Sequence, residues 1–119
     1  MKITISGQAK GSKNNVLMTR HGRRYPKPNF AAWRDYAILE VKGQNVLMEP
    51  ISRPVDVIIH YFPEDRRRRD VPGIIDGIWH VLERAGVVKD DALLGGFGKS
   101  VIFYNMGVSE KPRVVLEIG

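Results

Sequence analysis

Residues 55–86, VDVIIHYFPEDRRRRDVPGIIDGIWHVLERAG, decide the fold. Residues 55–62 are mostly β-branched or aromatic and predict a strand. The segment from Pro63 to Asp70 is a loop that carries a run of four arginines. A helix follows, because Pro72 suits a first turn, where a missing N–H costs nothing, and Gly86 is a natural stop. The stretch therefore predicts a strand, a charged loop and a helix in succession.

The helix expected from Pro72 to about Ala85 has one apolar side. Its apolar residues recur at helical spacing and are Ile74, Ile75, Ile78, Val81, Leu82 and Ala85. Asp76, His80 and Glu83 share the opposite face. Asp76 and His80 stand four positions apart, a spacing that can bind a metal, although such a pair on a polar face is more often solvated surface.

The rest of the chain supplies the elements around this stretch. Strands are expected at residues 2–6, 101–104 and 113–118, and a helix runs from Asn29, which can cap it, to about Lys42, where Gly43 can end it. Residues 7–28 predict a long basic loop with room for a short hairpin. The order β-α-β-α-β-β predicts an α+β (mixed α/β) fold. We expect a single small domain over residues 1–119, with two main helices packed on one mixed sheet of about four strands.

Composition limits the class of protein. A chain of 119 residues with 43% hydrophobic and 27% charged residues suits one soluble globular domain. There is no apolar run of about 18 residues and no signal-peptide core at the N-terminus, so we expect nothing to span a membrane. Cysteine is absent, which fits a reducing compartment. We expect a cytoplasmic protein without a membrane partner or a small-molecule substrate.

The charge is strongly positive and unevenly distributed. The net charge is +6 and the pI about 9.8, and residues 1–34 contain no Asp or Glu. This asymmetry predicts a footprint for a phosphate backbone, the alternative being a solvated basic surface. The candidate DNA contacts are Lys13, Arg20, Arg23, Arg24, Lys27, Arg66, Arg67, Arg68 and Arg69.

Aspartates flank the predicted helix on both sides. Asp70 lies at its start, directly after the arginines, and Asp90 and Asp91 follow its end. Mg²⁺ prefers carboxylate oxygens and commonly takes only one or two from protein, with water and substrate phosphate completing its shell. Phosphodiester cleavage needs such a metal together with cations that hold the backbone. The alternative is structural: helix capping by Asp70, charge balance for the arginines, and a polar turn at Asp90–Asp91.

The chain carries in succession the segment Asp65-Arg66-Arg67-Arg68-Arg69-Asp70, the helix, Ala85-Gly86 and Asp90-Asp91-Ala92. This arrangement resembles the RusA family of Holliday-junction resolvases. In that family an arginine-rich loop precedes an Asp-x-Asp-Asn helix start, and an Asp-Asp pair follows the helix at the spacing found here. The Lys13-Asn14-Asn15 segment and Trp33-Arg34-Asp35 also look similar, so the resemblance covers most of the chain.

The resemblance implies a crossover junction endodeoxyribonuclease. Such an enzyme is a homodimer that binds four-way DNA junctions in recombination and repair and cuts symmetrically placed strands with Mg²⁺, for which Mn²⁺ is a possible substitute. Asp70 and Asp91 match the family's metal-binding and catalytic aspartates, and Asp90 sits beside them. In this interpretation the basic residues bind the DNA.

One part of the motif departs from the family pattern. The second aspartate of the family is Pro72 here, the following Asn is Gly73, and a lysine expected one turn later is Asp76. In one reading Asp76 replaces the lost ligand and joins the metal and catalytic set. In the other reading the site is decayed, and a non-cleaving DNA-binding protein remains on the same scaffold.

Overall fold

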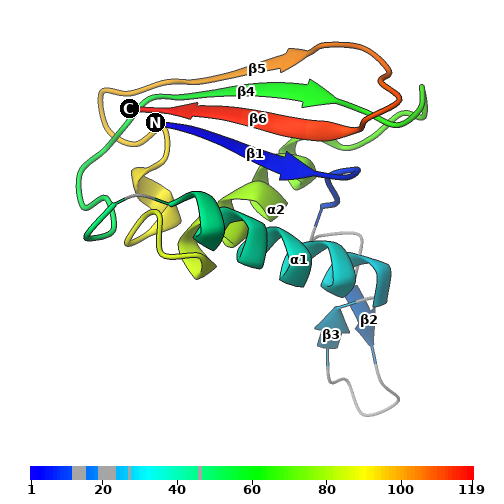
Figure 1. Ribbon diagram of the computed structural model, residues 1–119, viewed down its shortest axis with the longest axis horizontal. Helices are drawn as coiled ribbons and strands as arrows, with labels where there is room; N and C mark the ends of the chain where they lie inside the picture. The colour runs from blue at the N-terminus through cyan, green and yellow to red at the C-terminus, as the bar shows by residue number, and fades with distance from the viewer. Residues whose placement is uncertain (12–15, 19–23, 27, 46) are drawn as a thin grey trace.

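Two helices lie against a four-stranded mixed sheet, and a two-stranded hairpin stands apart from them (Figure 1). The computed structural model describes residues 1–11, 16–18, 24–26, 28–45 and 47–119. Its elements in chain order are β1 (Lys2–Ser6), β2 (Val16–Met18), β3 (Arg24–Pro26), α1 (Pro28–Gln44), β4 (Val57–Phe62), α2 (Val71–Arg84), a 3₁₀ helix (Asp91–Leu93), β5 (Val101–Asn105) and β6 (Arg113–Ile118). The predicted α+β fold is confirmed.

The main sheet has the strand order β1-β6-β4-β5. β6 pairs antiparallel with both β1 and β4, so that Leu116 faces Ile3 on one side and Ile59 on the other. β4 and β5 are parallel, with Ile59 opposite Phe103. A parallel pair needs a long crossover, and α2 with the residues after it provides one.

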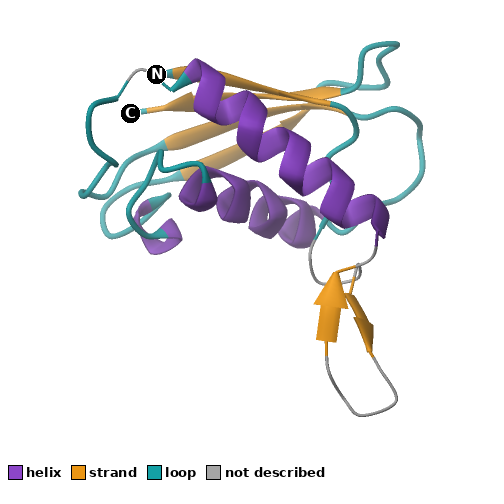
Figure 2. Cartoon of the chain, turned by 60° about the horizontal axis from the view of Figure 1, so that its bottom comes forward, coloured by secondary structure: helices purple, strands orange, loops and turns teal. Residues whose placement is uncertain are grey.

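Both helices cover the same face of this sheet (Figure 2). The alternation of β4 places Val57, Ile59 and Tyr61 in the core between sheet and helices. No helix of the described residues covers the other face, and Ile102 and Tyr104 of the outer strand β5 are 43% and 48% exposed there. The helix-covered face therefore holds the core, and the open face is left to solvent.

Helix α1 is longer at both ends than the sequence predicts. It starts at Pro28 rather than after a cap at Asn29, and it continues through Gly43 to Gln44. The side chain of Gln44 explains the extension, because its Nε2 donates to the carbonyl of Thr4 at 2.7 Å and its Oε1 accepts from the N–H of Thr4 at 2.9 Å. These two bonds to β1 hold the last turn, so the prediction that Gly43 ends the helix is wrong.

Helix α2 follows its prediction within one residue, with Pro72 in its first turn. After the helix, Gly86 adopts a φ of +79°, which glycine accepts without strain. Two glycines, Gly77 on α2 and Gly11 after β1, allow the backbone after β1 to cross the helix directly. A Cβ on Gly77 would collide with the carbonyl oxygen of Lys10, and a Cβ on Gly11 would come within 2.9 Å of the Gly73 backbone.

The hairpin of β2 and β3 confirms the expectation of a short hairpin within residues 7–28. Arg24 opens β3, whereas Lys13, Arg20, Arg23 and Lys27, which are candidate DNA contacts, lie outside the described residues. Within the described ranges, no helix is both long and apolar enough to cross a membrane.

Candidate nucleic-acid interface and carboxylate site

The loop of residues 64–70, called the arginine loop below, is fastened to the core by one buried amide. Gln8 is 7% exposed, and its Oε1 accepts from the N–H of Glu64 at 2.8 Å. Its Nε2 donates to the Tyr61 hydroxyl at 2.6 Å and to the carbonyl of Ala9 at 3.0 Å. Gln8 therefore ties the start of the arginine loop to the end of β4 and to the chain leaving β1.

Within the arginine loop, Arg69 serves as an internal brace. Its guanidinium lies 2.9 Å from Asp65 and 3.4 Å from Glu64, and its side chain is only 20% exposed. The hydrogen bond from Arg69, together with one from the backbone N–H of Arg67, lowers the pKa of Asp65 below its usual value. The Asp65 carboxylate is therefore ionised at neutral pH, and the brace is intact there.

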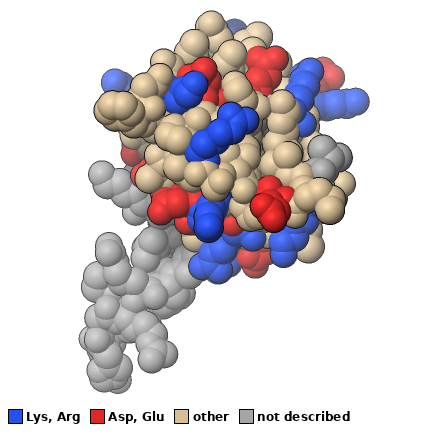
Figure 3. Space-filling view, turned by 90° about the vertical axis from the view of Figure 1, so that its left-hand side faces the viewer, with Lys and Arg blue, Asp and Glu red and all other residues tan. Residues whose placement is uncertain are grey.

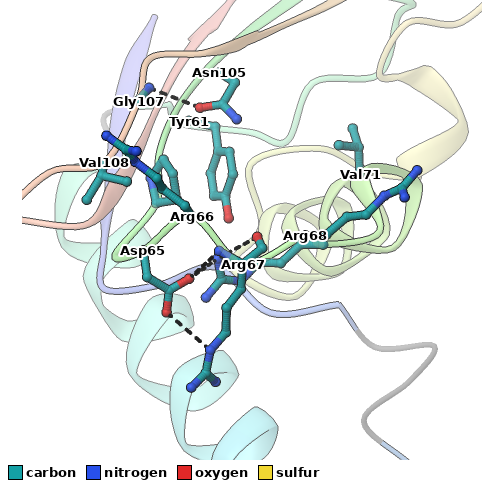
Figure 4. A pocket seen from close by; sticks show the side chains of 11 residues that line it. Tyr61, Asp65, Arg66, Arg67, Arg68, Val71, Asn105, Gly107 and Val108 are labelled. Atoms are coloured by element: carbon teal, nitrogen blue, oxygen red, sulfur yellow. Dashed lines mark hydrogen bonds and ion pairs between the residues drawn. The ribbon is translucent and has the colours of Figure 1, made fainter.

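The other arginines of the loop are available to a ligand. Arg67 is 84% exposed and lies at a loose 3.8 Å from Asp65. Arg66 and Arg68 form no ion pair in the part of the chain that the structure describes. All three line a hollow of about 610 Å³ between the arginine loop, the end of β4 and the connection from β5 to β6 (Figure 4). Free cations around a hollow suit an anionic ligand.

Asp70 sits directly before the first residue of α2. It occupies the N-cap position, yet its side chain makes no capping hydrogen bond. It also joins none of the ion pairs formed by the described residues, although arginines precede it. Its carboxylate lies against the first turn, where Oδ2 would be 2.9 Å from a Cβ on Gly73. Neither helix capping nor charge balance, the two structural explanations for an aspartate here, accounts for Asp70.

Asp90 and Asp91 differ in their surroundings. Asp90 caps the 3₁₀ helix, since its Oδ1 accepts from the N–H of Ala92 at 2.9 Å. The side chain of Asp91, half-buried at the start of that helix, makes no hydrogen bond or ion pair within the described ranges, although its backbone carbonyl accepts from the N–H of Leu94 at 3.0 Å. The polar-turn explanation therefore fits Asp90, whereas Asp91 keeps its carboxylate free.

His80 of α2 lies between charges of both signs. Burial lowers its pKa, and Arg84 and Arg34 lower it further, while Glu83 and Asp91 act in the opposite direction. The imidazole is therefore neutral at pH 7. The 3₁₀ helix that carries Asp91 is in contact with α2.

The four predicted carboxylates are not gathered at one point. Asp76 is exposed and lies six residues after Asp70, which is about 9 Å along a helix axis. Asp91 is among the charges that act on His80, which lies in α2 ten residues after Asp70. Among the described residues, no three carboxylate or imidazole side chains are placed to hold a metal ion. The oxygen donors suit Mg²⁺, but such an ion would need further ligands from water or from a substrate phosphate.

The two ends of the sheet differ in the charged groups that they carry. Figure 3 shows that end, where basic and acidic side chains are interspersed rather than separated by sign. The arginine loop and the β5–β6 connection lie together at the opposite end of the sheet (Figure 1). The candidate nucleic-acid interface is therefore the end of the molecule where α2 begins.

One known protein is similar to this chain in sequence. The crossover junction endodeoxyribonuclease RusA of Aquifex aeolicus (strain VF5) is 30% identical to the chain over 81 residues. The chain is RusA-like. The similarity covers 68% of this RusA-like chain but only 64%, less than two thirds, of the relative's own length. No family model matches the chain.

Three residues of this RusA-like site escape prediction from the sequence. Gln8, Tyr61 and Asn105 belong to the end of the molecule that carries the arginine loop, yet they stand in three separate segments of the chain. Gln8 contacts Tyr61 across 53 positions, and no local pattern marks such a pair. The sequence offers one weak signal for this pair. Gln8 is a polar residue just after the first strand, where the chain must turn across the core.

Proposed function

We propose that this chain is a structure-selective DNA endonuclease that binds and resolves four-way (Holliday) junctions in recombination and repair. The observation that carries the proposal is the carboxylate of Asp70, which stands where the arginine loop meets α2 and makes neither a capping bond nor an ion pair with the described residues. The RusA relative supports it, since its name describes a crossover junction endodeoxyribonuclease.

The chain's own residues divide the work between holding DNA and acting on it. Arg66, Arg67 and Arg68 bind phosphates, because their guanidinium groups are exposed at the hollow. Arg69 and Gln8 position the loop that carries them. The N-terminus of α2 adds the positive end of a helix dipole beside Asp70. A phosphate drawn to this place lies near a carboxylate that makes no capping bond and no ion pair with the described residues.

Magnesium completes the proposal, with manganese as a possible substitute. When bound, a divalent cation polarises a phosphate and provides a reactive water at neutral pH. Asp70 and Asp91 are the ligands we propose, with Asp76 or Asp90 as an additional carboxylate. Asp90 is the weaker of these two, since its oxygen already accepts the bond from Ala92.

A homodimer is part of the same proposal. A four-way junction presents two equivalent strands, and a two-fold dimer presents two equivalent sites to them. The outer strand β5 exposes Ile102 and Tyr104, on a face that no helix of the described residues covers, and this face has room for a second copy.

The proposal is tested with a synthetic four-way junction and a linear duplex of the same sequence. We expect the protein to cut the junction in the presence of Mg²⁺, to leave the duplex intact, and to cut neither when the metal is chelated. Cleavage that is equal on both substrates would contradict structure selectivity, and cleavage in chelator would contradict metal dependence.

A second function, non-cleaving DNA binding, is favoured by one specific observation. The first turn of α2 contains Pro72 and no acidic residue, and the described carboxylates form no three-membered group. If Asp76 replaces the missing ligand, Asp76→Asn will remove most junction cleavage while leaving binding intact. A parent protein that cuts only after Pro72→Asp would show instead that the site is decayed. Cleavage that is indifferent to Asp76→Asn would show that Asp70, Asp90 and Asp91 suffice.

The salt dependence of junction binding reports the arginine contacts. Each phosphate contact contributes roughly 0.9 to the slope of log K against log salt. We expect Arg66→Ala and Arg68→Ala each to reduce that slope by about this amount. Arg53→Ala is the matched control, because Arg53 is exposed and does not line the hollow. Unchanged slopes in the two loop variants would place the DNA footprint elsewhere.

A further inference from the structure

We propose that the hollow beside the arginine loop receives one nucleotide of the junction and reads its base through Asn105. This inference rests on the proposed function and adds to it a base-reading residue. In this arrangement the base lies against the end of β4 and the β5–β6 connection, and the phosphate of the same nucleotide lies at the rim formed by Arg66 and Arg68 (Figure 4).

The wall of the hollow formed by the β5–β6 connection is held in place by backbone bonds. The N–H of Met106 donates to the carbonyl of Tyr61 at 2.8 Å, and that of Ser109 donates to the carbonyl of Pro63 at 2.9 Å. Gly107 turns the chain between them with a φ of +90°. A wall fixed in this way can distinguish ligands, because it does not yield to fit each one.

The amide of Asn105 has one orientation. Its Oδ1 accepts from the N–H of Gly107 at 3.0 Å, and since an N–H donates only to the oxygen, the amide nitrogen must take the other position. Figure 4 shows that nitrogen on the side of Tyr61. Its two hydrogens have no acceptor in the described part of the chain, so they are available to a ligand in the hollow.

Tyr61 supplies a second donor and an apolar surface. Its hydroxyl oxygen accepts from Gln8, so its own hydrogen remains free to donate. Its ring, with Pro63, Val71 and Val108, gives the hollow apolar lining. The hollow therefore combines apolar surface, neutral hydrogen-bond donors and cations.

A nucleotide fits this combination better than a smaller anion. A base is flat and apolar on its faces, carries acceptors on its edge, and is joined to a phosphate. The hollow's volume of about 610 Å³ lies in the range of sites for small organic ligands and exceeds what a phosphate ion needs. Val71, the first residue of α2, lines the hollow, so a nucleotide held here lies beside the start of α2.

The test measures binding in chelator, so that cleavage does not enter. A panel of four junctions differs only in the base at one position beside the crossover, and the position is moved along the strand in successive panels. At one position we expect the wild-type protein to distinguish the best from the worst base by about tenfold, as a good set of base contacts does. A 2-aminopurine placed there should become more fluorescent on binding, because it leaves the base stack.

Two variants and a matched control assign this preference to Asn105. Asn105→Asp keeps the acceptor for Gly107 but removes both donors, and Asn105→Ala removes the side chain. We expect both to reduce the tenfold ratio to about one. Asn45→Asp is the control, since Asn45 makes the same kind of turn with Leu47 at 3.1 Å and does not line the hollow, so its ratio should stay at the wild-type value.

The outcomes separate this inference from the proposed function. Wild-type ratios retained in both Asn105 variants, or flat ratios at every position in the wild type, would overturn the base pocket while junction binding stands. Variants that weaken binding to all four bases equally would also overturn it, because the hollow would then hold a phosphate without reading the base. A wild-type protein that binds junction and duplex equally would contradict the proposed function itself.

Discussion

Asp70→Asn is expected to reduce junction cleavage by at least about a hundredfold, because loss of even an outer-shell partner of a metal site costs 10–100-fold. The substitution keeps the size of the side chain and removes its charge. Binding should survive or tighten, since a negative charge leaves a face that attracts phosphates. Folding should also survive, because Asp70 makes no capping bond that would be lost. The measurement compares cleavage rates at saturating protein with dissociation constants in chelator.

Glu49→Gln is the control for this change in charge. Glu49 is exposed and forms no ion pair with the described residues, and it lies in the connection after α1 rather than at the arginine loop. Its substitution should leave cleavage within about twofold of the wild type, as exposed charges remote from a site have small effects. A cleavage rate that is equally low in both variants would remove the specific role of Asp70.

Gly77→Ala is expected to have the largest effect on stability. The added methyl group would collide with the carbonyl oxygen of Lys10, which is backbone and cannot rotate away. Overpacking of this kind typically costs about 1–3 kcal/mol, and the helical preference of alanine offsets only part of it. We expect the free energy of unfolding to fall by about 2 kcal/mol, measured by urea denaturation.

The same substitution at a different glycine should act in the opposite direction. Gly43 lies in α1 with nothing within 4 Å of the position of an added Cβ. Gly43→Ala should therefore stabilise the protein by about 0.5–1 kcal/mol through backbone entropy alone. If both variants proved more stable than the wild type, the close crossing of Lys10 over α2 would be wrong.

The crossing of the chain over α2 at Gly77 also concerns the part of the motif that departs from the family pattern. Gly73, where the family has an asparagine, lies beneath Gly11 and beside the Asp70 carboxylate. A Cβ at position 73 would press on the Asp70 carboxylate, and a Cβ at position 11 would press on the Gly73 backbone. The two glycines therefore allow the chain after β1 to lie close to the start of α2.

The sequence predicts the scaffold well for a local reason. The apolar residues of β4 and α2 recur without interruption at the spacing of a strand and of a helix, and Pro72 and Gly86 mark the two ends of the helix. Where prediction fails, a distant contact decides the structure. Helix α1 passes Gly43 because Gln44 bonds to Thr4, forty positions away in the chain.

The site is predicted less completely than the fold. Within the arginine loop, Asp70 directly follows the four arginines in the sequence, and the loop keeps them adjacent in space. The sequence cannot show that Arg69 is used as a brace, because its role depends on the geometry that pairs it with Asp65 and Glu64. Nor does spacing along the chain show how far Asp91 lies from Asp70, because that distance depends on how the 3₁₀ helix packs on α2.

The most direct test of the central claim is a map of the cut positions on every strand of one four-way junction. We predict two nicks in Mg²⁺, placed symmetrically on opposing strands and absent with Asp70→Asn. This result would follow from two equivalent Asp70 sites acting on two equivalent strands. A wild-type protein that binds the junction tightly yet leaves all strands uncut in both Mg²⁺ and Mn²⁺ would contradict the account.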